Sequence, residues 1–161
     1  MRKLAIDCEM VGARGNKQLL AKVALVDENL YCVYDKFVAP TGTVTDYRTS
    51  ISGITAIYLR GAPSFSQVQR EVANLISGCL LIGHSVADVD LAVLNLNHPE
   101  HNIRDVAKYP PFKQYNYGNK PSLKMLAEKV LGERIHDGPH DPVQDAKTAM
   151  KLYKKVAHQW Q

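Results

Sequence analysis

Apolar residues in the first third of the chain fall into short runs that are separated by polar or glycine-containing segments. Runs of this length, bounded by turn residues, are typical of β-strands. The second and third runs are separated by Glu28 and Asn29, which indicates a hairpin. Two more short runs follow later in the chain. The pattern predicts five strands, over residues 3–7, 19–27, 30–38, 79–82 and 102–106.

The apolar spacing changes to a helical period in the next part of the chain. Val68, Val72 and Ile76 recur on one face of a helix. Farther on, Asp141 and Pro142 are residue types favoured at a helix N-cap and at the first helical position. Helices are therefore predicted over 64–76, 90–96, 122–131 and from 142 onwards, with an irregular loop over 109–120. Together these elements predict an α/β domain with a single mixed five-stranded sheet flanked by helices.

The composition is that of an ordinary globular protein, with 45% apolar and 22% charged residues. A length of 161 residues predicts one domain, spanning 1–161. The apolar runs are shorter than the ~18 residues of a membrane helix, so no membrane partner is expected. Three widely spaced cysteines favour a reducing, intracellular compartment over a disulfide framework or structural zinc. The formal net charge of +4 is compatible with a polyanionic partner.

Asp7 and Glu9 flank Cys8 at the end of the first predicted strand. Side chains two positions apart in a strand point to the same face. Both carboxylates are therefore expected on one side, about 6–7 Å apart, with Cys8 facing the core. Like charges held this close destabilise each other unless a cation lies between them. The pair indicates a cation-binding site.

Two further carboxylates occur where predicted helices begin. Asp90 opens the helix after the fourth strand, and Asp145 lies in the first turn of the last helix, five residues after His140. Four carboxylates at one edge of a sheet need divalent ions to neutralise them, and hard oxygen ligands favour Mg²⁺ or Mn²⁺. A nearby histidine can take a proton from the attacking water. This set indicates a two-metal enzyme that cleaves phosphodiesters.

Four ordered motifs of the chain resemble one known family. They are Asp7-Cys8-Glu9-Met10-Val11-Gly12, Tyr34-Asp35-Lys36-Phe37, Thr45-Asp46-Tyr47-Arg48-Thr49 followed by Ser52-Gly53-Ile54, and His140-x4-Asp145-Ala146. From residue 4 to about residue 153, the chain resembles the DEDDh 3′-to-5′ exonucleases. Within them it is similar to the branch that contains RNA exonuclease 4 and the interferon-stimulated exonuclease.

The resemblance implies a ribonuclease-H-like fold and metal-dependent 3′-to-5′ cleavage of single-stranded nucleic acid, with RNA preferred over DNA and nucleoside 5′-monophosphates released. It implies two Mg²⁺ or Mn²⁺ ions held by Asp7, Glu9, Asp90 and Asp145, with His140 as the catalytic base. It also implies a role in RNA processing and a nuclear, nucleolar or cytoplasmic location, and it names no protein partner. Two alternatives stay open: a nucleic-acid-binding module with weakened catalysis, and a DNA-preferring exonuclease of the same superfamily.

The second motif departs from the family pattern. The family has four residues between Gly-His and the catalytic Asp, whereas five separate His84 from Asp90. Counting from His84 alone places Val89 in the acid's position. Counting back from the apolar residues of the following helix selects Asp90 over Asp88. A one-residue bulge would accommodate the extra residue, so Asp90 is the predicted third acid, and the altered spacing is the reason to consider weakened catalysis.

Substrate contacts are predicted at two places. The backbone of residues 10–12 (Met10, Val11 and Gly12) follows the first acids and is expected to seat the terminal nucleotide, with the Met10 side chain against its sugar or base. Arg48 is expected to hold a phosphate and the ribose 2′-hydroxyl, the group that distinguishes RNA from DNA. The alternative for Arg48 is pairing with Asp46 or capping the short turn over 52–59.

The histidines need separate interpretations. His84 falls in the predicted substrate-binding segment, where a structural role with its ring bonded to backbone is favoured. His136 and His140 compete for the role of catalytic base. The spacing to Asp145 favours His140, and His136, in a polar loop, is expected to be solvated.

Overall fold

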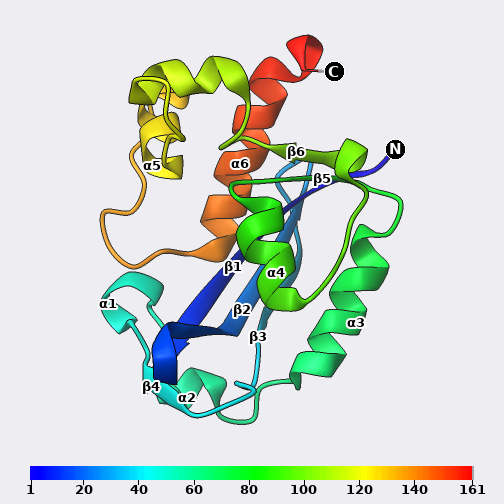
Figure 1. Ribbon diagram of the computed structural model, residues 1–161. Helices are drawn as coiled ribbons and strands as arrows, with labels where there is room; N and C mark the ends of the chain where they lie inside the picture. Colours follow the sequence, from blue (N-terminus) through cyan, green and yellow to red (C-terminus); the bar gives the residue numbers. More distant parts are fainter. Residues whose placement is uncertain (161) are drawn as a thin grey trace.

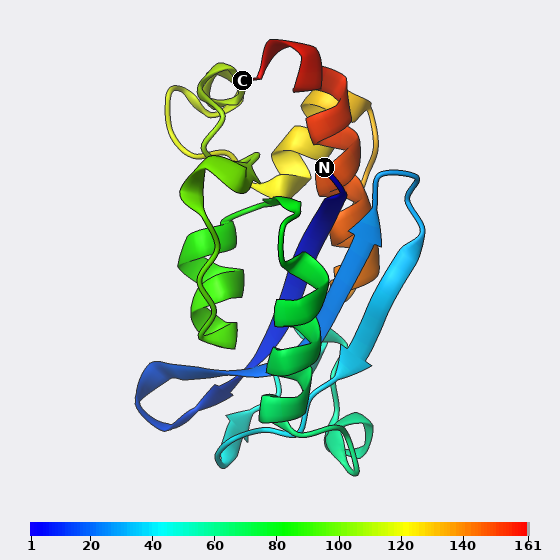
Figure 2. The ribbon, with the colours of Figure 1, turned by 90° about the vertical axis from the view of Figure 1, so that its right-hand side faces the viewer.

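A single sheet with helices on both faces forms the computed structural model, which describes residues 1–160 (Figures 1 and 2). The strands are β1 Lys3–Ala13, β2 Lys17–Asp27, β3 Cys32–Phe37, β4 Val44–Asp46, β5 Leu80–Gly83 and β6 Ile103–Asp105. They are ordered β3-β2-β1-β5-β6, with β4 paired to the far end of β1. The β1, β2 and β3 ladders are antiparallel, whereas β5 pairs in parallel with β1 and β6. The predicted α/β fold is confirmed, with six strands in place of five because the short, polar β4 gave no signal.

The helices agree with the sequence pattern where their N-caps are strong. They are α1 Thr49–Ser52, α2 Ala56–Leu59, α3 Phe65–Ile76, α4 Ala92–Leu94, α5 Leu123–Leu126 and α6 Pro142–Val156, with 3₁₀ segments η1 Arg14–Asn16, η3 Glu100–Asn102, η4 Pro110–Asn116 and η6 Ala157–Gln159, and π-helical segments η2 Val86–Leu91 and η5 Ala127–Leu131. The hydroxyl of Ser64 accepts the Gln67 N–H and starts α3. The carboxylate of Asp141 accepts the Val143 N–H and starts α6.

The prediction of an irregular loop over 109–120 was wrong, because η4 occupies part of it. Pro110 lies in the first turn, where its fixed φ suits a helix and its missing N–H costs nothing. Within residues 1–160, the helices are all too short or too polar to cross a membrane.

Alternation along β1 decides which side chains reach the site. Leu4, Ile6 and Cys8 pack into the core under α3 and α4, whereas Ala5 packs against α6 on the opposite face. Figure 2 shows α3 in front of the strands and α6 behind them. The odd-numbered positions that follow Ala5 therefore face α6, which places the acids of β1 on the side from which α6 approaches.

The first strand extends six residues beyond its predicted end, from Asp7 to Ala13, so the two acids lie in mid-strand and not at the point where the strand leaves the core. Asp7 is opposite Ala24 and Glu9 is opposite Lys22 of β2. The extension is stabilised by pairing with β2 on one side and with β4 on the other, which short-range sequence patterns do not report. A bulge between Glu9 and Met10 places the extra residue Ala21 in β2. Bulges of this kind re-aim side chains beside sites.

The segment after β5 accommodates the extra residue of the second motif. Gly83 approaches its neighbours closely, because a Cβ at this position would lie 2.7 Å from Val86 Cγ2. The next turn, η2, is π-helical. A π-turn holds one more residue than an α-turn and occurs frequently at functional sites. The one-residue bulge expected from the sequence is thus present, in the form of a π-turn.

Candidate functional site

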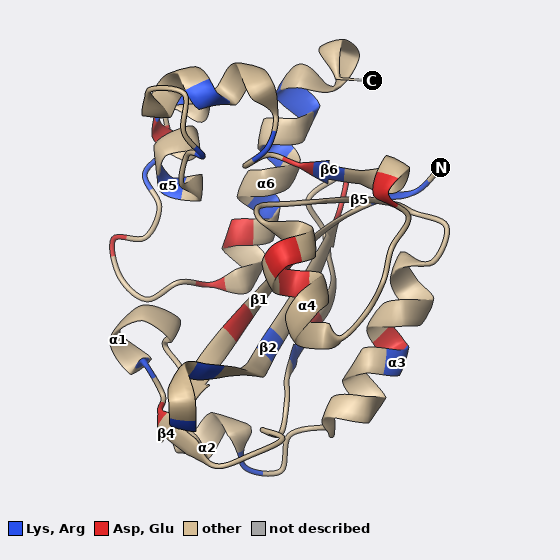
Figure 3. Cartoon of the chain, viewed as in Figure 1, with Lys and Arg blue, Asp and Glu red and all other residues tan. Residues whose placement is uncertain are grey.

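Three carboxylates from two elements converge at the centre of the molecule. Asp7 and Glu9 extend from the middle of β1, and Asp145 extends from the first turn of α6. One oxygen from each lies within 4.8 Å of the others. Figure 3 shows acidic positions on β1, at the start of α6 and on the η2–α4 segment grouped in the middle of the view. Glu9 is 8% exposed and Asp145 is 5% exposed, so these acids are largely withdrawn from water.

The π-turn directs the two acids of the second motif in opposite directions. Asp90 is 1% exposed, and the backbone and thiol of Cys8 lie close enough to lower the pKa of its carboxyl against the effect of burial. Asp88 is exposed and forms an ion pair with Lys108 at 3.2 Å. Asp90 is close enough to raise the pKa of the Asp7 carboxyl. The structure therefore brings Asp90 to the acids of β1 and places Asp88 on the surface.

Asp105, at the end of β6, fixes the backbone at the start of this turn. Nothing in the sequence had indicated a role for it. Its Oδ1 accepts the N–H of Ser85 at 2.8 Å, and its Oδ2 accepts the N–H of Val86 at 3.1 Å. A buried carboxylate with these donors fixes the chain just before η2. Asp105 thereby positions Asp90, and its charge adds to the raised pKa of that carboxyl.

The carboxyl groups are costly to ionise in this arrangement. The pKa of Asp7 is raised well above its usual range by burial, and further by the charges of Asp90, Asp145 and Glu9. Burial also raises the pKa of Glu9 to about 8, with the charges of Asp145 and Asp141 adding to the effect and Lys22 opposing it. The pKa of Asp90 is raised as well, first by burial. A cation placed among these groups would reverse each shift.

Two of the buried carboxylate oxygens lack a hydrogen-bond partner in the part of the chain that the structure describes. Asp7 Oδ2 and Asp90 Oδ2 have no hydrogen-bond partner among residues 1–160. Buried polar atoms are normally satisfied, so an orphaned carboxylate oxygen calls for an ion or a ligand. Donors that are all carboxylate oxygens suit Mg²⁺ or Mn²⁺. The residues present therefore fit a divalent metal site.

His140 lies beside the carboxylates on the loop before α6. Its Nδ1 is 4.0 Å from Glu9 Oε1, and its backbone N–H donates to the carbonyl of Ile51 in α1. The pKa of His140 is lowered from 6.5, mainly by burial and then by the neighbouring His136, with Asp145 opposing the shift. The imidazole is thus neutral near pH 7 and able to accept a proton.

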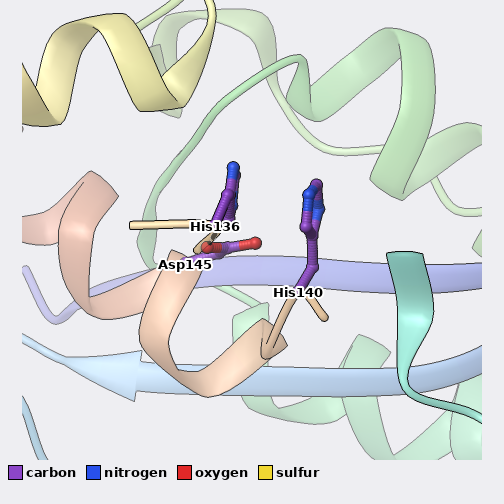
Figure 4. Close-up of side chains that lie close together, drawn as sticks. All are labelled: His136, His140 and Asp145. Carbon is purple, nitrogen blue, oxygen red and sulfur yellow. Dashed lines mark hydrogen bonds and ion pairs between the residues drawn. The ribbon is translucent and has the colours of Figure 1, made fainter. Parts of the chain in front are cut away.

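His136 is not solvated, and that prediction was wrong. Its side chain is 15% exposed, and Nε2 lies 2.8 Å from Asp145 Oδ1, within hydrogen-bond distance. The rings of His136 and His140 stack with centroids 3.6 Å apart and planes 10° from parallel (Figure 4). His136 has φ of 63°, a left-handed conformation that is uncommon outside glycine. The loop therefore turns back on itself and brings His136 to Asp145 of α6. The sequence had suggested only that this loop is a polar surface segment.

Met10 and Gly12 follow the two acids along β1. A cavity of about 260 Å³ is lined by Met10 of β1 and by Val89 and Val93 of the η2–α4 segment. Gly12 contacts the Arg48 side chain, since a Cβ at Gly12 would lie 3.3 Å from Arg48 Nη2. Val11 is fully buried, so its side chain is part of the core.

Arg48 and His84 both form hydrogen bonds that support the local structure. The backbone N–H of Arg48 donates to Asp46 Oδ1 at 2.9 Å, and its carbonyl accepts the N–H groups of Ile51 and Ser52 at the start of α1. The guanidinium takes no part in these bonds. His84 Nε2 lies 2.8 Å from the carbonyl oxygen of Pro121, which agrees with the structural role favoured for it.

Comparison with known proteins decides the family. The profile of the exonuclease family, RNase_T, matches residues 4–153. The chain belongs to this exonuclease family. Its curated relatives include RNA exonuclease 4 from Homo sapiens, 45% identical over 162 residues that cover 99% of this chain and 38% of that protein. RNA exonuclease 4 from Neurospora crassa is 48% identical over 157 residues, covering 96% of this chain and 38% of the relative. The chain thus spans well under half the length of these relatives.

Solved structures of exonuclease modules share the fold. The Pan2 catalytic unit of Neurospora crassa aligns with a TM-score of 0.85 and 27% identity, covering 98% of this chain and 27% of that one. The Saccharomyces cerevisiae Pan2 module in complex with A7 RNA aligns with a TM-score of 0.84 and 29% identity, covering 98% of this chain and 28% of that one. The ribonuclease-H-like fold implied by the sequence motifs is confirmed.

Proposed function

We propose that the chain is a metal-dependent 3′-to-5′ exonuclease that degrades single-stranded RNA and releases nucleoside 5′-monophosphates. The observation that carries the proposal is the convergence of Asp7, Glu9 and Asp145 oxygens within 4.8 Å of one another, with buried Asp90 beside them. The relatives named RNA exonuclease 4 and the Pan2 modules bound to RNA support RNA as the substrate class. An intracellular role in RNA processing is part of the proposal.

The four acids would hold two Mg²⁺ or Mn²⁺ ions. Asp7, Glu9 and Asp145 would hold one ion, and Asp90, with Asp7, would hold the other directly or through water. When bound, such a pair activates the attacking water and stabilises the leaving oxygen of an in-line displacement. The orphaned oxygens of Asp7 and Asp90 support this assignment. The π-turn supports an active enzyme over a weakened one, because it keeps Asp90 beside Asp7 despite the longer spacing.

His140 acts as the general base. Its lowered pKa leaves a ring nitrogen free to accept the proton of the attacking water at neutral pH. The loop position, with one backbone bond to Ile51, lets the ring adjust when substrate enters. His136 holds Asp145 by its hydrogen bond and holds His140 by stacking, so it positions both groups.

The terminal nucleotide is seated between β1 and the η2–α4 segment. Met10, Val89 and Val93 offer apolar surface for a base or a sugar in the cavity of about 260 Å³. Arg48, whose guanidinium lies against Gly12, offers donors for a phosphate or a 2′-hydroxyl. These contacts are to features that all nucleotides share, so little sequence readout is expected.

Single-turnover cleavage of 3′-labelled oligonucleotides tests the proposal. Matched RNA and DNA strands are incubated with excess protein in Mg²⁺, Mn²⁺ or EDTA, and a 3′-phosphorylated strand serves as the polarity control. We expect labelled mononucleotide to appear first, faster from RNA than from DNA and not at all in EDTA. Binding without cleavage would favour the nucleic-acid-binding alternative. Faster cleavage of DNA would favour a DNA exonuclease.

A further inference from the structure

We propose that His136, His140 and Asp145 form a second metal site, suited to a borderline transition-metal ion such as Zn²⁺ and sharing Asp145 with the all-carboxylate site. One ligand atom from each of the three residues lies within 4.8 Å of the others. This group is separate in chemistry from the Asp7, Glu9 and Asp145 group, because two of its three donors are imidazoles.

The geometry is close to that of a bound ion. Figure 4 shows the two imidazole rings side by side, with the Asp145 carboxylate next to them. Zinc ligands at about 2.0–2.2 Å from the ion in a tetrahedron lie roughly 3.3–3.6 Å from one another. Rotation of the stacked rings about their χ angles brings their lone pairs together, and the ion takes the place of the proton that His136 and Asp145 share at 2.8 Å.

The residue types select the ion. Imidazole nitrogens suit zinc, copper and nickel, whereas carboxylates without nitrogen ligands suit magnesium and manganese. The spacing His136-x3-His140 lies within the three to five residues that separate paired histidines in zinc sites. Three protein ligands leave a fourth position for water, the arrangement of zinc sites that remain open. Asp145 therefore belongs to two adjacent groups of ligands, one of hard carboxylate oxygens and one that includes softer imidazole nitrogens.

The segment that carries both histidines is able to close on an ion. Residues 132–141 form no helix or strand, whereas Asp145 is fixed in α6. The His140 side chain is 34% exposed and the His136 side chain 15% exposed, so an ion can reach the nitrogens from solvent.

Occupancy of this site would inhibit cleavage, a consequence that rests on the proposed function. An ion bound to His140 takes the lone pair that the general base needs, and it also takes an oxygen of Asp145. Zn²⁺ should therefore lower the rate even in saturating Mg²⁺. Zinc can also enter the carboxylate site of a magnesium enzyme, so the test must separate the two locations.

Co²⁺ is the spectroscopic probe, because its visible absorption reports nitrogen-containing tetrahedral coordination. The wild-type chain and its Asp7→Asn variant, which keeps the histidine site, are expected to show these bands at one equivalent. His136→Ala should lose them and weaken Zn²⁺ binding in calorimetry by at least tenfold, since even outer partners of zinc ligands contribute 10- to 100-fold. His101→Ala, at an exposed histidine outside the group, is the matched control and should behave as the wild type.

The activity arm measures Zn²⁺ inhibition of the wild type, the His136 variants and His101→Ala, each relative to its own rate in Mg²⁺. We expect the inhibitory concentration to rise at least tenfold in His136→Ala and in His136→Gln, which keeps a polar side chain at the position. Co²⁺ bands and Zn²⁺ affinity unchanged by His136→Ala would overturn the proposal, as would their loss in Asp7→Asn alone. Metal binding that depends on His136 in a chain without nuclease activity would uphold the site and refute only the proposed function.

Discussion

The acids and the histidines of the site are held in different ways. Asp7, Glu9 and Asp145 lie on β1 and α6, whose positions are set by strand pairing and by core packing of residues such as Ala5 and Met150. The histidines lie on an irregular loop, held by one backbone bond to α1, a ring stack and a bond to Asp145.

The difference separates two tasks. A group of carboxylates that repel one another must be preorganised by rigid elements, because nothing in the group itself holds it together before an ion binds. A base or a regulatory ligand benefits from freedom to move, and a loop supplies it. Variants that affect one region and spare the other test this division.

Asp7→Asn should have the largest effect, with loss of measurable cleavage. A shared ligand contributes several kcal/mol of charge stabilisation, which corresponds to about 10³-fold or more in rate. The metal-free variant should be at least as stable as the wild type, because a buried carboxyl that is costly to ionise is removed. Single-turnover rates and thermal unfolding in EDTA measure both effects. Cleavage at the wild-type rate would refute the role of the β1 acids.

His140→Ala should slow cleavage by about 10²–10⁴, the usual contribution of a general base, while RNA affinity changes little. In the wild type, the rate should rise with pH to a plateau, with a midpoint below 6.5 because burial lowers the pKa of His140 from that value. His136→Ala is the comparison variant and should cost less, since His136 acts through its two neighbours. A larger loss in His136→Ala would transfer the role of base to His136.

Asp90→Asn should slow cleavage by roughly ten- to a hundredfold, the cost of about 1.5–3 kcal/mol for losing one charged interaction. The effect is smaller than for Asp7 because Asp90 lies outside the group of oxygens within 4.8 Å. Asp88→Asn removes an acid two residues away that pairs with Lys108 at the edge of the Met10 cavity, and it should lower the rate far less than Asp90→Asn. Equal losses in both variants would argue against a specific role for Asp90.

Arg48→Ala should reduce RNA cleavage by up to about ten- to a hundredfold and DNA cleavage less, since one charged donor is worth roughly 1.5–3 kcal/mol. The ratio of the two rates would therefore narrow. Arg48→Lys, which keeps the charge but not the planar fork, separates charge from geometry. An unchanged ratio with both rates lowered would limit Arg48 to phosphate binding or to the start of α1.

The smallest expected effect is on stability. In the ion-free protein the pKa of Glu9 is about 8, against an ordinary value of 4.5. Between these values the folded state binds more protons than the unfolded state, so the free energy of unfolding falls as pH rises through this window. Thermal unfolding in EDTA should show a melting temperature that falls with pH across this window. Mg²⁺ should restore the melting temperature at the alkaline end, and Glu9→Gln should flatten its dependence on pH. Stability that increases with pH across the window would contradict this account.

Local patterns in the sequence were sufficient for most strands, for α3 and α6 and for the acids on β1 and α6, but not for α1, α2 or the start of η2 at Val86. Period-two spacing placed Asp7 and Glu9 on one face, and the Asp141–Pro142 start placed Asp145 in the first turn of α6. The extension of β1 to Ala13 and the small strand β4 depend on pairing between distant segments, which such patterns do not contain. His136 was misjudged because its position depends on a left-handed backbone and on contacts formed only in the folded loop.

The π-turn of η2 has an evolutionary consequence. Its additional residue is accommodated at the surface, where Ala87 is exposed, while Leu91 and Leu94 remain in the core and Asp90 remains beside Cys8. The number of residues in this turn can therefore change without moving Asp90. Insertion or deletion of one residue would convert the turn between π and α forms, and this would alter the wall of the Met10 cavity while Asp90 stays beside Cys8.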